Sequence, residues 1–237
     1  MLTTPRYRLV IFDYDGTLCA THHAVSYAIK SAFVACGIRS PADEQIAEVI
    51  RTGCSLYDTM RRLHPNDESD VVDAEILNRL VTCYRDSYAK GGRVLARVYD
   101  GAHGTFQSLS RSGASIVVMS NKGEVALKHS LRESELLNFV SLVIGDKGNV
   151  MPGKPDPTAY HALIKPTFPK IISPETIIVG DTHADLLFAR NAAIDSCWAL
   201  YGYGDPAKCR EAGYTFAIQS IQGIIPIVLD QGTPKPT

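Results

Sequence analysis

The sequence has no excess of charge of either sign and no long hydrophobic run. Among its 237 residues, 24 lysines and arginines are balanced by 25 aspartates and glutamates, which gives a formal net charge of -1. A chain this close to neutral has no broad basic face, so we expect no nucleic-acid partner. The longest apolar run near the N-terminus, Leu9–Phe12, is far shorter than the roughly 20 residues that span a bilayer. We therefore expect no membrane partner.

Cysteines at metal-binding or redox spacing are also absent. None of the six cysteines belongs to a Cys-x-x-Cys or zinc-type motif. Disulfide frameworks are typical of small secreted domains, and no stretch near the N-terminus is typical of a secretory signal. We expect a reduced, soluble, cytoplasmic protein. Its hydrophobic fraction of 45% suffices for one full-sized core and a small second domain.

Short apolar runs alternate with amphipathic segments along most of the chain. Five of these runs predict buried strands, over Arg8–Phe12, Ser115–Met119, Ser141–Ile144, Thr176–Val179 and Ser196–Leu200. An aspartate followed by a proline indicates helix starts at Asp156 and Asp205, and Gly213 should end the second of these helices. Strands that alternate with helices favour an α/β fold, a Rossmann-like parallel-sheet core with helices on both faces.

One segment, residues 19–95, interrupts this alternation. Apolar residues at helical spacing predict three helices there: the first stops at Gly37, the second begins at Ser55 and stops at Pro65, and the third stops at Gly91–Gly92. We expect the apolar stripe of the third helix to be core, at Ile76, Leu77, Leu80, Val81, Tyr84 and Tyr88. The predicted organisation is an α/β core over 1–18 and 96–230, a helical domain inserted at 19–95, and a flexible tail at 231–237.

The first predicted strand leads directly into two aspartates. Asp13 and Asp15 are two residues apart, so on a strand they would point to one side at its carboxyl end, where open α/β sheets bind ligands. Gly16 lets the chain turn away. Converging carboxylates repel each other unless a cation lies between them, and an oxygen-rich site favours Mg2+. The alternatives are an acidic turn or a calcium loop, although such a loop needs a carboxylate at its twelfth position, which is Ala24 here.

A second acidic pair follows the fourth predicted strand. Asp181 and Asp185 are four residues apart as the chain enters a helix, so they can share one face of it and bind metal. Taken alone, an acid-rich helix N-cap is an equally good interpretation. A parallel sheet can place the ends of two strands side by side, and this possibility favours a joint acidic site.

Two further segments are candidates for holding a phosphate. Ser120-Asn121-Lys122 follows a strand and offers a hydroxyl and N–H groups at a helix start. Lys154 lies in a proline-rich turn before another helix. Neither is specific alone, because Ser-Asn is a common helix cap and a lysine beside prolines is usually solvated.

In this order, the motifs closely resemble those of the haloacid dehalogenase superfamily, in particular its phosphoglycolate phosphatase-like branch. The resemblance covers nearly the whole chain, and the inserted helical domain resembles the family's C1 cap. The matching segments are Asp13-x-Asp15-Gly16-Thr17, Ser120-Asn121-Lys122, Lys154 and Gly180-Asp181-Thr182-x-x-Asp185, with similar stretches at Tyr99-Asp100-Gly101, Gly153-Lys154-Pro155 and Tyr201-Gly202-Tyr203-Gly204.

The resemblance implies a magnesium-dependent phosphatase with Asp13 as nucleophile. Asp15 would protonate the leaving oxygen and later activate water, while its backbone carbonyl binds magnesium together with Asp13, Asp181 and Asp185. The groups implied to hold the phosphoryl group or the substrate are Ser120, Lys154, Gly16, Thr17 and Asn121, with a specificity loop at Arg51, Thr52 and Gly53. The substrate would be a small phosphorylated metabolite, such as phosphoglycolate, a sugar phosphate or a nucleotide. Neither the physiological substrate nor the oligomeric state follows from the sequence.

Two departures from the family pattern bear on this interpretation. His22 and His23 follow the first motif, and we interpret them as solvated polar residues rather than parts of a hinge. The family's Ala-Gly pair after the fourth motif is Ala192–Ala193, which we expect only to stiffen a turn.

Asp15 also bears on which other activities of the superfamily this chain resembles. Asp15 argues against a dehalogenase and a phosphonate hydrolase, because relatives of those kinds lack this second acid. A phosphoglucomutase-like phosphotransferase keeps Asp15 and remains an alternative. A non-catalytic binding module with this fold is a third possibility, which the intact acidic set disfavours.

Overall fold

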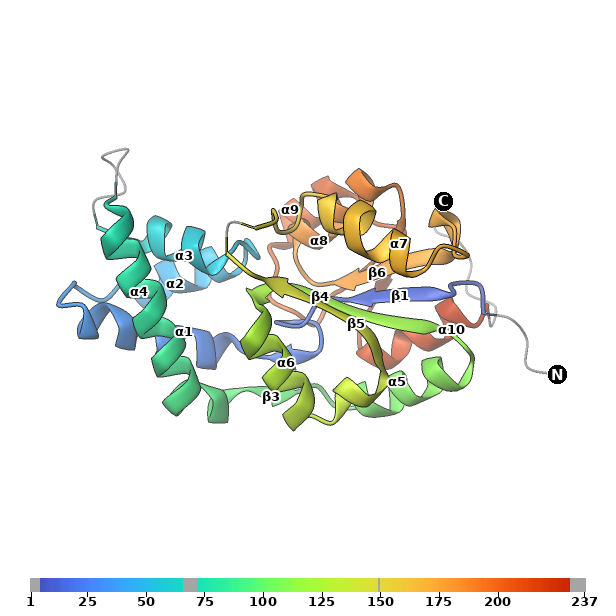
Figure 1. Cartoon of the computed structure of the whole chain (residues 1–237), viewed down its shortest axis with the longest axis horizontal. Coiled ribbons are helices and arrows are strands. Elements are labelled where there is room, and N and C mark those ends of the chain that lie inside the picture. The colour runs from blue at the N-terminus through green and yellow to red at the C-terminus, as the bar shows by residue number, and fades with distance from the viewer. Residues whose placement is uncertain (1–4, 66–71, 149, 231–237) are drawn as a thin grey trace.

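The computed structural model describes residues 5–65, 72–148 and 150–230, so the tail expected at 231–237 lies outside the described residues. At its centre is a six-stranded sheet in the order β5-β4-β1-β6-β7-β8, in which every neighbouring pair is parallel (Figure 1). The strands are β1 (Leu9–Phe12), β4 (Ser115–Gly123), β5 (Val140–Asp146), β6 (Thr176–Gly180), β7 (Asp195–Ala199) and β8 (Phe216–Ile218). The five predicted strands are confirmed as β1, β4, β5, β6 and β7, whereas β8 was not predicted.

Helices cover both faces of this sheet, as alternation along β1 requires. Val10 and Phe12 pack on one face with α5 (Ala102–Arg111), α6 (Glu124–Glu133) and α10 (Ile224–Val228). Leu9 and Ile11 pack on the other face with α8 (His183–Ala192) and with a π-helical turn, Tyr160–Ile164, that leads into α7 (Lys165–Thr167). The helix expected after Asp205 is α9 (Pro206–Ala212). The predicted fold class, a parallel α/β core, is therefore confirmed.

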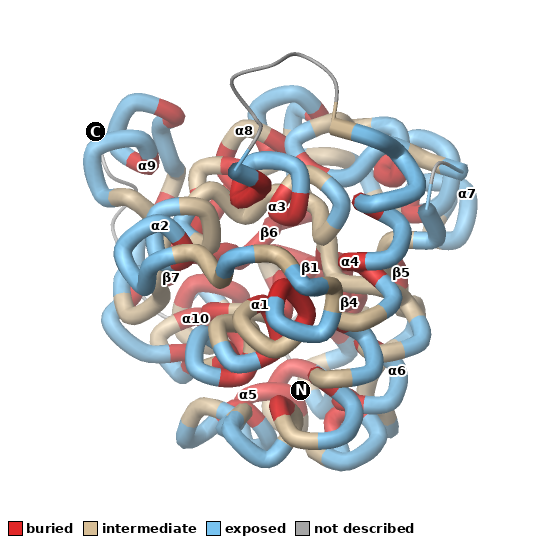
Figure 2. Tube along the Cα trace, turned by 90° about the vertical axis from the view of Figure 1, so that its left-hand side faces the viewer, coloured by how far each residue is buried: buried red, intermediate tan, exposed pale blue. Residues whose placement is uncertain are grey.

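A helical insert, which we define as residues 22–95, follows β1. It contains α1 (His22–Ala35), α2 (Asp43–Ile50), α3 (Leu56–Leu63) and α4 (Ala74–Ser87), and then a π-helical turn at Tyr88–Gly92 and a 3-10 turn at Arg93–Leu95. These helices share a hydrophobic core of their own, separate from the two that flank the sheet. Figure 2 shows buried stretches facing inward and exposed outer turns in these helices. The three predicted helices correspond to α1, α3 and α4.

Three details of the insert differ from the expectation. The helix α2 was missed, because a helix of 8 residues with one buried side chain, Ile46, has little apolar periodicity. Ile76 was expected in the core but is 38% exposed on the outer side of α4. Gly91 and Gly92 do not stop the helical path, which continues through the π-helical and 3-10 turns to Leu95.

Two short strands join the insert to the sheet domain. β2 (Cys19–Ala20) and β3 (Arg97–Val98) pair antiparallel, so the outgoing and returning chains lie side by side. The domain boundaries at 18/19 and 95/96 stay a prediction. In the part of the chain that the structure describes, no helix is long and apolar enough to cross a bilayer.

Candidate active site

The candidate site lies at the carboxyl edge of the sheet. β1 is central and pairs with β4 on one side and β6 on the other. Asp13 follows β1, and its backbone N–H donates to Val179 O of β6 at 2.9 Å. Ser120 lies near the end of β4, Asp181 directly follows β6, and Lys154 lies in the connection after β5. Residues far apart in sequence therefore meet because parallel strands end at one edge.

Three carboxylates form a buried cluster at this edge. Asp13, Asp181 and Asp185 each offer an oxygen, and these oxygens lie within 4.8 Å of one another. The residues are 6%, 0% and 1% exposed. Burial, together with the nearby charges of Asp185 and Asp15, raises the pKa of Asp13 to about 7 despite the opposing effect of Lys154. Burial and the charges of Asp13 and Asp185 also raise the pKa of Asp181 well above its ordinary value. Burial and the repulsion among these carboxylates thus both disfavour their charged forms.

Lys154 is the cation inside this cluster. Its Nζ donates to Asp13 Oδ1 at 2.6 Å and to Asp185 Oδ1 at 2.5 Å, and also to Met119 O at 3.0 Å. Burial lowers the pKa of Lys154, but the carboxylates of Asp13 and Asp185 outweigh burial and raise it. The interpretation of Lys154 as a solvated lysine is wrong, since the residue is 6% exposed. Asn121 fixes its position by bonding both the N–H and the C=O of Lys154, at 2.9 Å each.

The carboxylate of Asp15 does not join the cluster. It pairs instead with Lys122, whose Nζ lies 3.2 Å from Asp15 Oδ1 and 4.1 Å from the centre of the Tyr88 ring. The expectation that Asp13 and Asp15 converge on one cation is therefore corrected. β1 ends at Phe12, so strand alternation does not extend to Asp15. The expectation that its backbone carbonyl binds metal stays a prediction. Lys122 belongs to the second motif, but no sequence pattern predicted that it pairs with Asp15.

Asp181 is held in place from several sides. Thr17 Oγ1 donates to its Oδ1 at 3.0 Å, and the N–H of Tyr203 donates to its Oδ2 at 3.0 Å. A Cβ on Gly16 would lie 2.3 Å from Asp181 Oδ2, and one on Gly202 would lie 2.1 Å from Asp181 Cβ. No real side chain fits so close, so both positions need glycine. Gly16 and Thr17 thus position Asp181, and the expectation that they bind substrate stays a prediction. The support from the 201–204 loop was not foreseen.

Asp185 caps α8, as one interpretation of the second acidic pair expects, and it also belongs to the acidic cluster. Its Oδ2 accepts from the N–H and Oγ1 of Thr182, at 3.1 and 2.7 Å, which makes a capping box at the start of α8. Its other oxygen faces Lys154. A capping role and a place in the acidic cluster are compatible, because the two carboxylate oxygens point to different partners.

Ser120 and Asn121 lie on a strand rather than at a helix start. β4 continues to Gly123, and α6 begins only at Glu124. The expectation of helix N–H groups around Ser120 is corrected, because β4 extends four residues beyond its predicted end at Met119. Ser120 is buried beside the cluster and its Oγ accepts from the N–H of Lys122 at 3.3 Å.

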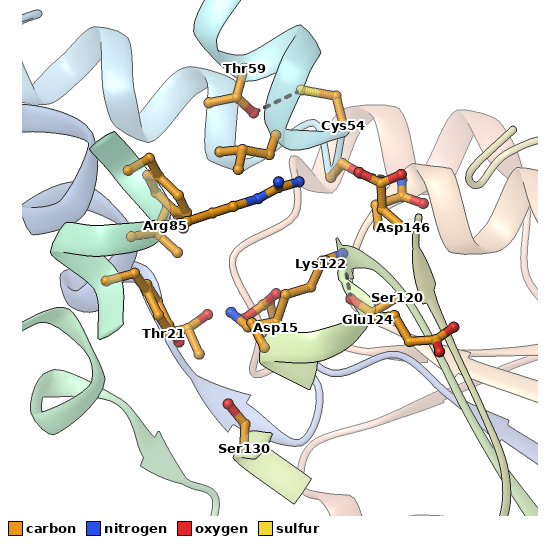
Figure 3. Close-up of a pocket in the computed structure, with 18 of the residues that line it drawn as sticks. Asp15, Thr21, Cys54, Thr59, Arg85, Ser120, Lys122, Glu124, Ser130 and Asp146 are labelled. Atoms are coloured by element: carbon orange, nitrogen blue, oxygen red, sulfur yellow. Dashed lines mark hydrogen bonds and ion pairs between the residues drawn. The ribbon is translucent and has the colours of Figure 1, made fainter. Parts of the chain in front are cut away.

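A cavity of about 910 Å3 opens between this edge and the helical insert (Figure 3). Asp13, Asp15, Ser120 and Lys154 line it from the sheet side. From the insert, its lining includes Val25, Val49, Ile50, Gly53, Cys54, Leu56, Thr59, Tyr84, Arg85, Tyr88, Ala89 and Arg93. The active-site carboxylates and the insert therefore enclose one shared space.

The expected specificity loop reaches this cavity at one residue. Gly53 lines it, and Gly53 O accepts from Asn121 Nδ2 at 2.8 Å. Among the described residues, Arg51 and Thr52 are not part of the cavity lining, and their expected contact with substrate stays a prediction. Arg51 is exposed, and Thr52 Oγ1 donates to Val49 O at the end of α2. Both residues lie directly after the C-terminus of α2, where Arg51 is the helix C-cap.

His22 and His23 begin α1 and do not line the cavity. Both are exposed, and their rings lie 3.9 Å apart. The exposure of both side chains agrees with their interpretation as solvated polar residues, although the ring of His22 also lies 5.6 Å from that of Tyr203. That they take no part in a hinge stays a prediction.

Comparison with known proteins gives a consistent result. The family model described as "Haloacid dehalogenase-like hydrolase" matches residues 10–199. The chain is 30% identical to phosphoglycolate phosphatase 1 of Pseudomonas aeruginosa, over 92% of this chain and 79% of that protein. It is 23% identical to phosphoglycolate phosphatase of Vibrio parahaemolyticus, over 96% and 98%. A crystal structure described as a predicted phosphoglycolate phosphatase from Haemophilus somnus shares the fold, with a TM-score of 0.81 and 18% identity over 94% of this chain and 98% of that chain. This chain belongs to the haloacid dehalogenase-like hydrolases.

Proposed function

We propose that this protein is a magnesium-dependent phosphatase that hydrolyses a small phosphomonoester through an aspartyl-phosphate on Asp13. The observation that carries the proposal is the contact of 2.6 Å between Asp13 Oδ1 and Lys154 Nζ, at the edge of a cavity large enough for a ligand. Relatives named phosphoglycolate phosphatase support the same reaction class.

Asp13 is suited to act as the nucleophile because Lys154 offsets its charge. A carboxylate and a phosphate dianion repel each other, and a buried ammonium beside both reduces that repulsion. The same ammonium would stabilise the negative charge of the transferring phosphoryl group. Ser120, which lines the cavity next to Asp13, would donate its hydroxyl to a phosphoryl oxygen. A covalent intermediate then divides one difficult displacement into two steps.

The residues of the acidic cluster fit a divalent cation with oxygen ligands. Three carboxylates and one ammonium leave negative charge that a dication would balance. Asp13, Asp181 and Asp185 would hold the ion, and oxygen donors are the ligands that Mg2+ prefers. When bound, such an ion polarises the phosphoryl group and neutralises charge that develops on it. Thr17 and Tyr203 would keep Asp181 oriented toward it.

Asp15 is the candidate general acid and base. Its carboxylate lines the cavity and is 26% exposed, so it can reach a leaving oxygen or a water molecule. It would give a proton to the leaving group in the first step and take one from water in the second. Lys122 would hold the carboxylate in position between these steps.

The assay that tests the proposal compares the wild-type protein with Asp13→Asn on a chromogenic aryl phosphate and magnesium. We expect turnover by the wild type and background release by the variant. Near-normal turnover by Asp13→Asn would refute the assigned nucleophile, and an inactive wild type would favour the non-catalytic binding module. When a sugar phosphate is supplied as the substrate, a product that retains a phosphate would instead identify the phosphoglucomutase-like alternative.

The six free cysteines support the expected cytoplasmic location.

A further inference from the structure

The cavity is much larger than the phosphoryl site at its sheet end. Its volume of about 910 Å3 lies in the upper part of the range of roughly 300–1,000 Å3 that encloses drug-sized ligands. A two-carbon phosphomonoester such as phosphoglycolate would leave most of this space unused. The remaining walls therefore bear on what else the substrate carries.

The wall that the insert contributes is largely apolar. Val25 of α1, Ile50 of α2, Leu56 of α3 and Tyr84 of α4 all line the cavity. Val25, Ile50 and Leu56 are only partly buried against the core of the insert, so part of each side chain remains available to a ligand. Such a wall favours an aliphatic or aromatic body over a sugar, whose hydroxyls would lose their hydrogen bonds to water there.

Arg85 of α4 is the exception on this wall. Its side chain projects from the helix into the cavity (Figure 3). The other cationic side chains that line the cavity have acidic or histidine partners: Lys122 has Asp15, Lys147 has Glu124, Lys154 has Asp13 and Asp185, and Arg93 has His129 and Glu133. Within the described ranges of the chain, the guanidinium group of Arg85 has no hydrogen-bond or ion-pair partner.

The acids on the cavity lining do not neutralise Arg85 either. Glu124 pairs with Lys128 and Lys147, and Asp146 accepts from the N–H of Gly148. A guanidinium group presents several N–H donors in one plane and matches the geometry of a carboxylate or phosphate. An unpaired guanidinium at an apolar wall is therefore suited to bind an oxyanion of the ligand.

Building on the proposed phosphatase function, we propose that the substrate's leaving group is a bulky apolar body bearing a second oxyanion, which Arg85 binds. Lys154 belongs to the sheet edge and Arg85 to the insert, so the two cations face the cavity from different walls. A ligand that reaches both needs a body between its two anionic ends. The apolar side chains of the insert would pack against that body. Arg85 is thus assigned as a specificity-determining residue.

The test measures binding, so it does not depend on turnover. Three benzylphosphonates are titrated calorimetrically into the full chain with magnesium: one with a 4-methyl group, one with a 4-carboxymethyl group and one with a 4-phosphonomethyl group. We expect both anionic compounds to bind the wild type roughly ten- to hundredfold more tightly than the methyl compound, as a charge-assisted hydrogen bond predicts. The tighter of the two identifies the second oxyanion as a carboxylate or a phosphate.

Two variants separate Arg85 from a general charge effect. Arg85→Gln should abolish the preference for the anionic compounds and leave binding of the methyl compound nearly unchanged, because that compound has no oxyanion for Arg85 to bind. Arg79→Gln removes the same charge from an exposed position on the same helix, outside the cavity lining, and should keep the preference. Leu56→Ser should weaken all three compounds but not inorganic phosphate. Val25→Thr, which keeps its shape, serves as a second variant should Leu56→Ser unfold.

The outcomes that overturn this inference differ from those that overturn the phosphatase. Equal dissociation constants for the three compounds, a preference that persists in Arg85→Gln, or no binding of any of them would refute the role of Arg85. Hydrolysis of 4-methylphenyl phosphate, assayed separately, reports only on the proposed activity. A wild type that discriminates among the phosphonates but hydrolyses no phosphate ester would support the binding site and refute the proposed phosphatase activity.

Discussion

Lys122 Nζ lies 3.2 Å from Asp15 Oδ1 and so ties the candidate acid/base residue to the end of β4. The Lys122 side chain is 8% exposed, and its ammonium also lies over the ring of Tyr88 in the helical insert. One lysine therefore contacts both the sheet edge and the insert. A change in the position of the insert would therefore shift Lys122 and, through it, the carboxylate of Asp15.

Replacing Lys122 should impair the chemical step more than substrate binding. Lys122→Gln removes the charge that orients Asp15, and we expect kcat to fall about tenfold or more, the scale of a lost charge-assisted hydrogen bond. KM should change by less. Steady-state kinetics on an aryl phosphate gives both constants, with Lys128→Gln, an exposed partner of Glu124, as the control. Recovery of kcat in Lys122→Arg would support positioning by charge, whereas an unchanged kcat in Lys122→Gln would exclude it.

Activity should depend on magnesium. Asp13, Asp181 and Asp185 present only oxygen ligands, and their mutual repulsion is relieved by a dication. Exhaustive chelation should abolish turnover, and added Mg2+ should restore it. Calcium should inhibit, because it takes more ligands at longer distances and would shift the reacting groups. Full activity after chelation would contradict the metal assignment.

Gly202 should be needed for metal binding. A Cβ at this position would lie 2.1 Å from Asp181 Cβ, so Gly202→Ala must displace the Asp181 side chain. Magnesium should raise the thermal midpoint of the wild type, because a ligand that binds the folded state stabilises it, and this increase should be small or absent in the variant.

The matched control for Gly202→Ala is Gly104→Ala. Gly104 lies within α5, where a Cβ would meet no atom within 4 Å. This change should stabilise the protein by about 0.5–1 kcal/mol, the helix preference of alanine over glycine, and leave the magnesium response intact. Equal magnesium responses in the two variants would argue against the role of Gly202.

Ala193→Gly should stabilise the protein. Ala193 ends α8 with φ 53° and ψ 47°, a left-handed conformation that is strained for alanine. The expectation that Ala192–Ala193 only stiffens a turn is therefore corrected. Glycine relieves the strain but adds freedom to the unfolded chain, so the net gain should be about 0.5–1 kcal/mol. Urea unfolding measures it, and a loss of stability in Ala193→Gly would contradict the inferred strain.

The sheet was predictable because its signals are local. β1, β4 and β6 are nearly continuous apolar runs, and such runs indicate strands buried on both faces whatever surrounds them. β8 was missed because it has 3 residues and one of them, Ala217, is exposed. The position of Asp13 and Asp181 at strand ends followed from the same local pattern.

The partners of the site residues could not be predicted, because they depend on which loops the fold brings together. The sequence around Lys154 is equally typical of a solvated lysine. Its buried position depends on the connection after β5, which lies beside β4, where Asn121 bonds the backbone of Lys154. The pairing of Lys122 with Asp15 has the same origin. Arg85 belongs to no motif, and its proposed role in binding follows only from its position on the cavity wall that α4 contributes.

The central claim is that Asp13 is the nucleophile, and a crystal structure with beryllofluoride and magnesium tests it most directly. Beryllofluoride mimics a phosphoryl group on the carboxylate that accepts one. We predict the fluoride complex on Asp13, with Lys154 in contact with a fluorine atom. A complex on Asp15, Asp181 or any other side chain would contradict the account.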